Sequence, residues 1–237
     1  MRVTPALTGV ALVVSLLGVP VSAEAAQPAQ AAADSAKAHR RNTWVVVHPY
    51  RHHKRFGAHL KLSGQLRYRS HGSVFAATGV KVRLLRRPAG SHHWRRIGSD
   101  TTSHGAKPTY SFGAKTRGNA DYRVVFRGNP HLQPSRKTVH LFVHRKLPAK
   151  VVQVSPTDLQ LVGHVVPRYR HQKVKLQKRD CRRCAWHPIR HQRTTSRSHF
   201  SFDVGAPRSG SWYFRVKTAR STRFAVSYSA TFRTFKP

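Results

Sequence analysis

The residues with the most distinctive chemistry are the two cysteines of the chain, Cys181 and Cys184, which two arginines separate. In a chain exported from the cell, where thiols oxidise, this spacing favours a disulfide that closes a short loop. Such a bond adds little stability, because the entropic gain grows with the length of the closed loop. Two alternatives stay open: a zinc site completed by His187 and His191, and a redox-active dithiol. The zinc spacing is tighter than in common zinc fingers, and no βαβ pattern accompanies the dithiol.

Histidine is the second group that could do chemistry, because the chain contains 17 of them, with adjacent pairs at His52–His53 and His92–His93. An imidazole changes its charge at about pH 6.5. The sequence therefore predicts tighter binding of anionic partners at mildly acidic pH. The pairs could also bind a metal ion, but adjacent histidines in a basic loop are more commonly just exposed, and no metal site is predicted.

Acidic residues are too few and too scattered to suggest catalysis. The chain has seven aspartates and glutamates, and five aspartates lie beyond the N-terminal segment. Hydrolysis by paired carboxylates would need two of them to meet in space. The sequence contains no G-x-S-x-G, no H-E-x-x-H and no glycine-rich phosphate loop. We therefore expect a non-enzymatic protein with no catalytic residues and no cofactor.

Charge is the strongest chemical signal, with 44 lysines and arginines and a formal net charge of +37. Residues 44–147 hold 21 basic and two acidic residues, and residues 148–237 hold 19 and three, so both halves carry the charge. Such a field attracts polyanions without a shaped site, and the binding weakens with salt. The expected partners are anionic cell-wall polymers or acidic polysaccharide, with extracellular DNA as a further candidate. The alternative is that the charge only keeps the chain soluble.

The predicted anion-binding residues are lysines and arginines that alternate with apolar residues along short segments. At a period of two, the apolar residues share one face of a strand and the basic residues share the other. The basic side chains then coat the faces diffusely, which favours adhesion over sequence-specific recognition of nucleic acid. They are Lys61, Lys81, Arg83, Lys173 and Lys175.

The elements that carry these residues occur twice in the chain. Short blocks of the first half reappear in the second half at a nearly constant offset, which indicates two copies of a unit of about 90 residues. An offset of 92 relates Val82 to Val174, Trp94 to Trp186, Ile97 to Ile189 and Arg123 to Arg215. Tyr110 and Phe112 match Phe200 and Phe202, and Gly64 matches Gly163.

Each copy reads as a series of short strands separated by turn residues. The alternating segments include residues 60–62, 80–84, 139–143, 173–176 and 200–202, and glycine or proline residues interrupt them. No long apolar period of 3.6 residues follows the N-terminal segment. This pattern predicts an all-β chain built as two tandem β-sandwich domains.

The repeated blocks resemble the tandem immunoglobulin-like β-sandwich repeats of secreted actinobacterial proteins. The pattern is an early glycine, V-x-L, W-x-x-I, (Y/F)-S-F and an aromatic-R-V strand. The resemblance covers most of residues 44–237 and implies extracellular adhesion, spacing or accessory roles rather than an activity. Trp94 and Trp186 could be platforms for sugar rings, but their equivalent positions favour packing. Neither copy has the paired cysteines of antibody domains.

The N-terminus predicts the compartment. A basic start, an apolar run and small residues around Ala25 form the layout of a secretory signal peptide, which we expect over residues 1–26. Residues 27–43 are predicted to be a disordered tether, followed by one sandwich domain over 44–147 and a second over 148–237. No later segment is apolar enough to span a bilayer. The mature chain is expected outside the cell, free or associated with its surface.

Overall fold

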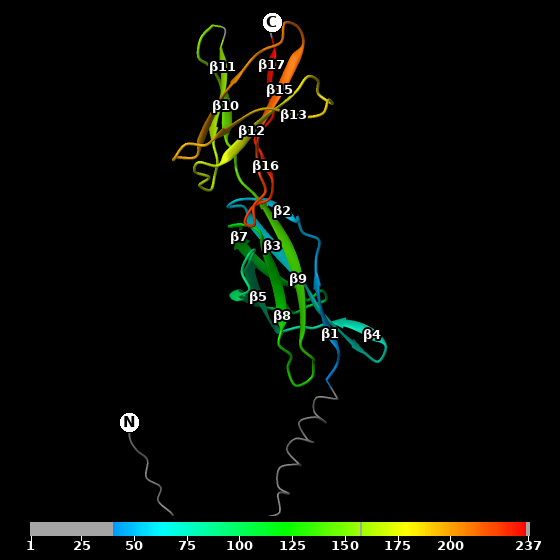
Figure 1. Cartoon of the computed structure of the whole chain (residues 1–237). Coiled ribbons are helices and arrows are strands. Elements are labelled where there is room, and N and C mark those ends of the chain that lie inside the picture. Colours follow the sequence, from blue (N-terminus) through cyan, green and yellow to red (C-terminus); the bar gives the residue numbers. More distant parts are fainter. Residues whose placement is uncertain (1–39, 157, 236–237) are drawn as a thin grey trace, which may run out of the picture. The chain divides into compact units, whose positions relative to one another are not determined.

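The computed structural model describes residues 40–156 and 158–235, and every regular element in these ranges is a β-strand (Figure 1). The predicted signal peptide and the predicted tether up to residue 39 lie outside the described residues. Within the described ranges, no helix is long and apolar enough to cross a membrane. The prediction of an all-β chain with immunoglobulin-like β-sandwich domains is confirmed.

The first sandwich consists of two sheets. In one sheet, the central strand β3 pairs with three antiparallel neighbours; its strands are β1 (Thr43–Val47), β3 (His59–Ser70), β4 (Ser73–Ala76) and β7 (Tyr110–Lys115). The other sheet has the order β2-β9-β8-β5-β6, with β2 (His53–Arg55), β9 (Ser135–His144), β8 (Ala120–Phe126), β5 (Lys81–Pro88) and β6 (Arg95–Thr101).

The second sandwich repeats this plan with fewer strands. Its smaller sheet has the order β10-β11-β14, with β10 (Ala149–Gln153), β11 (Leu159–His164) and β14 (His199–Val204). Its larger sheet has the order β13-β12-β15-β16, and β17 also pairs with β15. These strands are β13 (His187–Arg193), β12 (Lys173–Arg179), β15 (Ser211–Thr218), β16 (Ser227–Tyr228) and β17 (Phe232–Phe235).

Each sandwich has its own hydrophobic core, because alternate residues of strands such as β3, β8 and β15 face inward. In β8, for example, Tyr122 and Val124 are completely buried, and their neighbours along the strand are not. The repeated register is preserved: Leu84 lies opposite Val124, and Leu176 lies opposite Val216. Both copies also shift register at this point, directly after Leu84 in the β5–β6 pair and directly after Leu176 in the β12–β13 pair.

The repeated isoleucines lie outside the cores, and the end of the tether differs from the sequence-based expectation. The isoleucines of the W-x-x-I blocks, Ile97 and Ile189, are 44% and 45% exposed, so they do not belong to the cores. The end of the predicted tether is paired with the first sandwich. The Arg41 N–H donates to the His131 carbonyl oxygen, and Thr43 opens β1.

A buried aromatic side chain covers a glycine at the same place in each sandwich. Tyr110 lies opposite Gly64, and Phe200 lies opposite Gly163. The Tyr110 hydroxyl donates a hydrogen bond of 2.7 Å to the Val46 carbonyl oxygen, and burial raises the pKa of Tyr110 above its ordinary value. The repeated glycine is therefore a packing requirement, because a side chain there would occupy the space of the ring.

The segment before β16 connects the second sandwich to the first. Phe224 is buried in the core of the first sandwich. The Asn119 side chain donates to the Thr222 carbonyl oxygen at 3.0 Å, and its backbone N–H donates to the Arg223 carbonyl oxygen at 2.8 Å. The Arg145 N–H, which follows β9, donates to the Ser227 hydroxyl at 2.7 Å. This junction combines residues that lie far apart in the sequence.

Candidate polyanion-binding faces

Trp94 is held beside two arginines on the outer face of the first sandwich. The residue directly precedes β6, and its ring centroid lies 4.0 Å from the guanidinium carbon of Arg123 and 4.9 Å from that of Arg87. We call Arg87, Trp94 and Arg123 the first ladder. A cation over an aromatic face gains about 0.5–1 kcal/mol at an exposed site. The tryptophan therefore fixes two guanidinium groups on the surface.

The second sandwich repeats this arrangement and extends it. Arg215 and Arg179 lie 4.2 Å and 4.5 Å from the ring centroid of Trp186. Arg215 also lies 4.1 Å from the Tyr228 ring, and Arg179 lies 5.1 Å from the Tyr213 ring. Rings and cations thus alternate in the order Tyr228, Arg215, Trp186, Arg179, Tyr213. These five residues are the second ladder.

The strands position the ladders through the repeated register. In the first sandwich Leu85 lies opposite Arg123 on β8, and in the second Gln177 lies opposite Arg215 on β15. Each arginine is anchored by its Nε, which donates to the Thr138 hydroxyl at 3.0 Å in the first sandwich and to the Gln177 side-chain oxygen at 2.9 Å in the second. These hydrogen bonds leave the outer nitrogens of each guanidinium to other partners.

Within the part of the chain that the structure describes, the two ladders differ in their carboxylate partners. Asp121 receives hydrogen bonds from Arg87 at 2.6 Å and from His140 at 2.5 Å. Partial burial acts to raise the pKa of Asp121, but these two hydrogen bonds outweigh it and hold the pKa below its ordinary value. The equivalent position in the second sandwich, at an offset of 92, is Tyr213. Among the described residues, no ion pair joins a carboxylate to Arg179 or Arg215.

The second ladder therefore places two guanidinium groups side by side without an ion pair to any described carboxylate. Burial lowers the pKa of Arg215, and the nearby charge of Arg179 lowers it further, against an opposing effect of Tyr228. Arginine stays protonated despite such shifts. The lowered pKa indicates that the cationic form would be stabilised by an anion placed beside the ladder.

Four of the five lysines and arginines predicted from the sequence lie in the sheets that carry the ladders. Lys81 and Arg83 are on β5, in the sheet of the first ladder, and Lys173 and Lys175 are on β12, in the sheet of the second. Lys61 is on β3, in the opposite sheet of the first sandwich. Four are exposed and Arg83 is half-buried. Lys175 lies opposite Lys217, which extends the basic face next to Tyr228.

The ladder arginines were not among the predicted site residues. The signal that could have identified them is the repeat itself, because an offset of 92 also relates Arg87 to Arg179. An arginine that recurs at the same position beside a recurring tryptophan is a candidate stacking partner. The arginines at each tryptophan ring favour packing over the role of a free platform for sugars.

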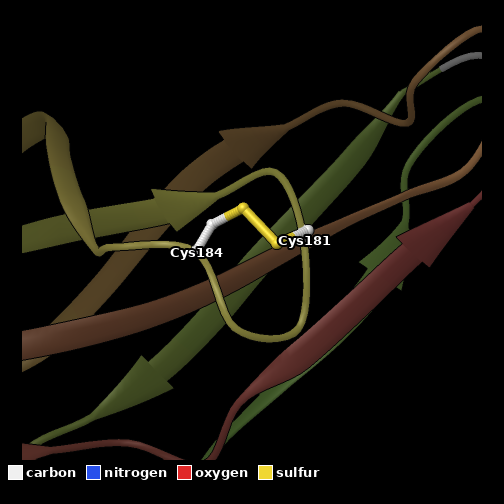
Figure 2. Close-up of a disulfide and its surroundings, with 2 residues drawn as sticks. All are labelled: Cys181 and Cys184. Atoms are coloured by element: carbon white, nitrogen blue, oxygen red, sulfur yellow. A yellow bond between two sulfur atoms is a disulfide. The ribbon is translucent and has the colours of Figure 1, made fainter.

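Cys181 and Cys184 are joined by a disulfide in the turn between β12 and β13 (Figure 2). The bond closes a tight turn that begins just after Arg179 and ends two residues before Trp186. Both sulfur atoms are bonded to each other, so they are not zinc ligands in this structure. Among residues 40–156 and 158–235, no three histidine, cysteine, aspartate or glutamate side chains form a cluster that could hold a metal ion.

Comparison with known proteins gives only a distant structural likeness. The sequence matches no protein-family model and no curated protein. One similar solved structure is described as "Cytokine receptor complex - Crystal form 1A"; it is 13% identical, and the match covers 81% of this chain and 95% of that chain with a TM-score of 0.38. The class that the fold itself defines is an all-β protein of two-sheet β-sandwiches.

Proposed function

We propose that the chain is a non-enzymatic extracellular protein that adheres to anionic polymers of the cell envelope or matrix. The observation that carries this proposal is the second ladder. Aromatic rings fix Arg179 and Arg215, and neither forms an ion pair with a carboxylate of residues 40–156 or 158–235. Arginine binds phosphate and carboxylate groups through two parallel hydrogen bonds. Holding the guanidinium groups in place reduces the entropy that they lose when an anion binds.

The remaining charge has a different role in this proposal. The lysines and arginines that surround the ladders raise the positive potential of both sandwiches and attract a polyanion over a longer range. The ladders then supply the ordered contacts at short range. Long-range attraction and short-range contact are thus supplied by different residues. The two roles account for a chain with a net charge of +37 in which tryptophans also fix four arginines.

The location rests on the N-terminal signal-like segment and on the repeats, which resemble those of secreted actinobacterial proteins. A second candidate function is a structural spacer of the cell surface, whose charge only sets its solubility. The ladders favour the first candidate, because solubility requires charge but does not require arginines to be arranged around aromatic rings.

The two candidates differ in their binding to isolated cell wall. The mature chain is mixed with wall material before and after chemical removal of its anionic polymers, and the bound fraction is measured. We expect the chain to bind intact wall and to lose this binding when the anionic polymers are removed. Equal binding to both preparations, or to neither, would favour the spacer.

Binding is also expected to tighten as the pH falls. His191 lies opposite Lys175, on the face of the second ladder, where Lys217 is the next residue across the sheet. A protonated imidazole at this position would add a cation to this face. We expect a two- to fivefold gain in affinity when the pH falls from about 7.5 to about 5.5, about the size of one exposed ionic contact. Equal affinity at the two pH values and fixed ionic strength would contradict this expectation, and a His191→Gln variant is the control.

A further inference from the structure

A cavity of about 570 Å³ lies where the two sandwiches meet, and its lining is strongly basic. The segment around β2 contributes Arg51, His53, Lys54 and Arg55, and the end of β9 contributes His144 and Arg145. Tyr228 and Ser229 close it from the second sandwich, and no aspartate or glutamate belongs to the lining. The cavity therefore holds hydrogen-bond donors and positive charge without an internal counter-ion.

The two histidines of the cavity are hydrogen-bonded to each other, and the donor and acceptor atoms can be assigned. Nδ1 of His144 lies 2.5 Å from the Val226 carbonyl oxygen, which can only accept, so this nitrogen carries the proton and donates. Nε2 of a neutral His144 then accepts a hydrogen bond of 2.9 Å from Nδ1 of His53.

Arg145, which also lines the cavity, holds a buried positive charge behind it. Its side chain is buried, with 8% of the residue exposed, and its Nε and Nη1 have no hydrogen-bond acceptor among the described residues. The guanidinium carbon lies 4.5 Å from the Tyr169 ring centroid and 4.3 Å from that of Phe224. Burial lowers the pKa of Arg145. Its Nη2 donates to the Ser221 hydroxyl at 3.4 Å, on the side away from the cavity lining. Arg145 therefore adds positive potential to the cavity and no direct contact with an anion.

We propose that this cavity, the junction pocket, binds a phosphate group of a linear phosphate-linked polymer. A phosphate accepts several hydrogen bonds at once and suits a lining of arginine, lysine and histidine donors. Polymers recognised by base stacking suit this surface less well, because recognition of single-stranded nucleic acid uses aromatic side chains on which bases stack. Tyr228 is the aromatic residue that the pocket shares with the second ladder. Its ring is already covered by Arg215 and Lys217, so it is a poor platform for a base.

The position of Tyr228 connects the pocket to the proposed function. This residue closes the junction pocket and also ends the second ladder. A polymer that lies along the outer face of the second sandwich thus reaches the pocket at Tyr228 and places one phosphate there. The pocket assignment rests on the proposed function and makes its ligand class specific.

Two double variants with the same change of charge test the proposal. Arg51→Gln with Arg55→Gln alters the pocket, whereas Arg67→Gln with Arg69→Gln removes two exposed arginines from β3. Binding of inorganic phosphate and of a short polyglycerol-phosphate is measured by calorimetry for both variants and the unaltered chain. We expect the pocket variant to lose at least tenfold in affinity for both probes, and the β3 variant to lose less than threefold. Equal losses in the two variants would overturn the pocket.

The phosphate probe separates the failure of the pocket from the failure of the proposed function. Phosphate should also shift the imidazole NMR signals of His53 and His144 in the unaltered chain, and unshifted signals would contradict the pocket. If the unaltered chain binds the polymer and phosphate does not perturb these histidines, the proposed function stands and the pocket is wrong. If phosphate perturbs them and the polymer does not bind, the pocket stands and the proposed function is wrong.

Discussion

The affinity of the chain for a linear anionic polymer is expected to fall about 300-fold when salt rises from about 50 to 200 mM. Neutralising one charge of a single-stranded polyanion contributes about 0.7 to the slope of log affinity against log salt. Arg179, Arg215, Lys173, Lys175 and Lys217 supply five contacts on the second sandwich, and the junction pocket supplies a sixth. Six contacts give a slope of about 4, and a fourfold increase in salt then gives the stated loss.

The measurement is a binding titration at several concentrations of one salt and at constant pH. A neutral polysaccharide of similar length serves as the control, because it releases no counter-ions. A slope near zero would show that the basic faces do not contact the polymer. A slope far steeper than 4 would show that the whole basic surface, rather than one face, takes part.

The second large effect is expected at Gly163, where an alanine should destabilise the second sandwich by about 2 kcal/mol. A Cβ atom at this position would lie 2.5 Å from the Pro148 carbonyl oxygen and 2.7 Å from Cζ of Phe200. Both distances are shorter than a tolerable contact, and relieving them requires the buried ring or the backbone to move. Overpacking of this kind costs about 1–3 kcal/mol.

Gly205→Ala is the matched control, because the nearest atom to an added Cβ there is a ring carbon of Trp212 at 3.4 Å. Both variants are unfolded with denaturant, and the transition of the second sandwich is followed by tryptophan fluorescence. We expect the control to change the free energy of unfolding by less than about 0.5 kcal/mol. If Gly163→Ala were as stable as the control, the packing of Phe200 over the glycine would be wrong.

The fold could be predicted because its causes are local. Alternating residues such as Val82 and Leu84 face the core wherever they occur in a strand, and the repeat at an offset of 92 fixes the number of copies. The exposure of Ile97 and Ile189 could not be predicted in this way. Each isoleucine is the extra, unpaired residue at the register shift between neighbouring strands, which changes how the apolar pattern maps onto the two faces.

The candidate sites were only partly predictable. The alternation of basic and apolar residues predicts that Lys173 and Lys175 face outward, and both are exposed on β12. The stacking of Arg215 between Trp186 and Tyr228 depends on side chains from three strands or their ends, which the pattern of one strand does not specify. The junction pocket depends on the return of the segment around Phe224 to the first sandwich, a contact between distant parts of the sequence.

The most direct test of adhesion through the second ladder compares two variants with equal net charge. Arg179→Gln with Arg215→Gln removes the ladder cations, and Arg170→Gln with Arg208→Gln removes two exposed arginines elsewhere on the second sandwich. Binding of both variants to an anionic wall polymer is measured at one fixed salt concentration. We expect the ladder variant to lose at least tenfold in affinity and the control to lose less than threefold. Equal losses would contradict a localised site and would show that net charge alone governs the binding.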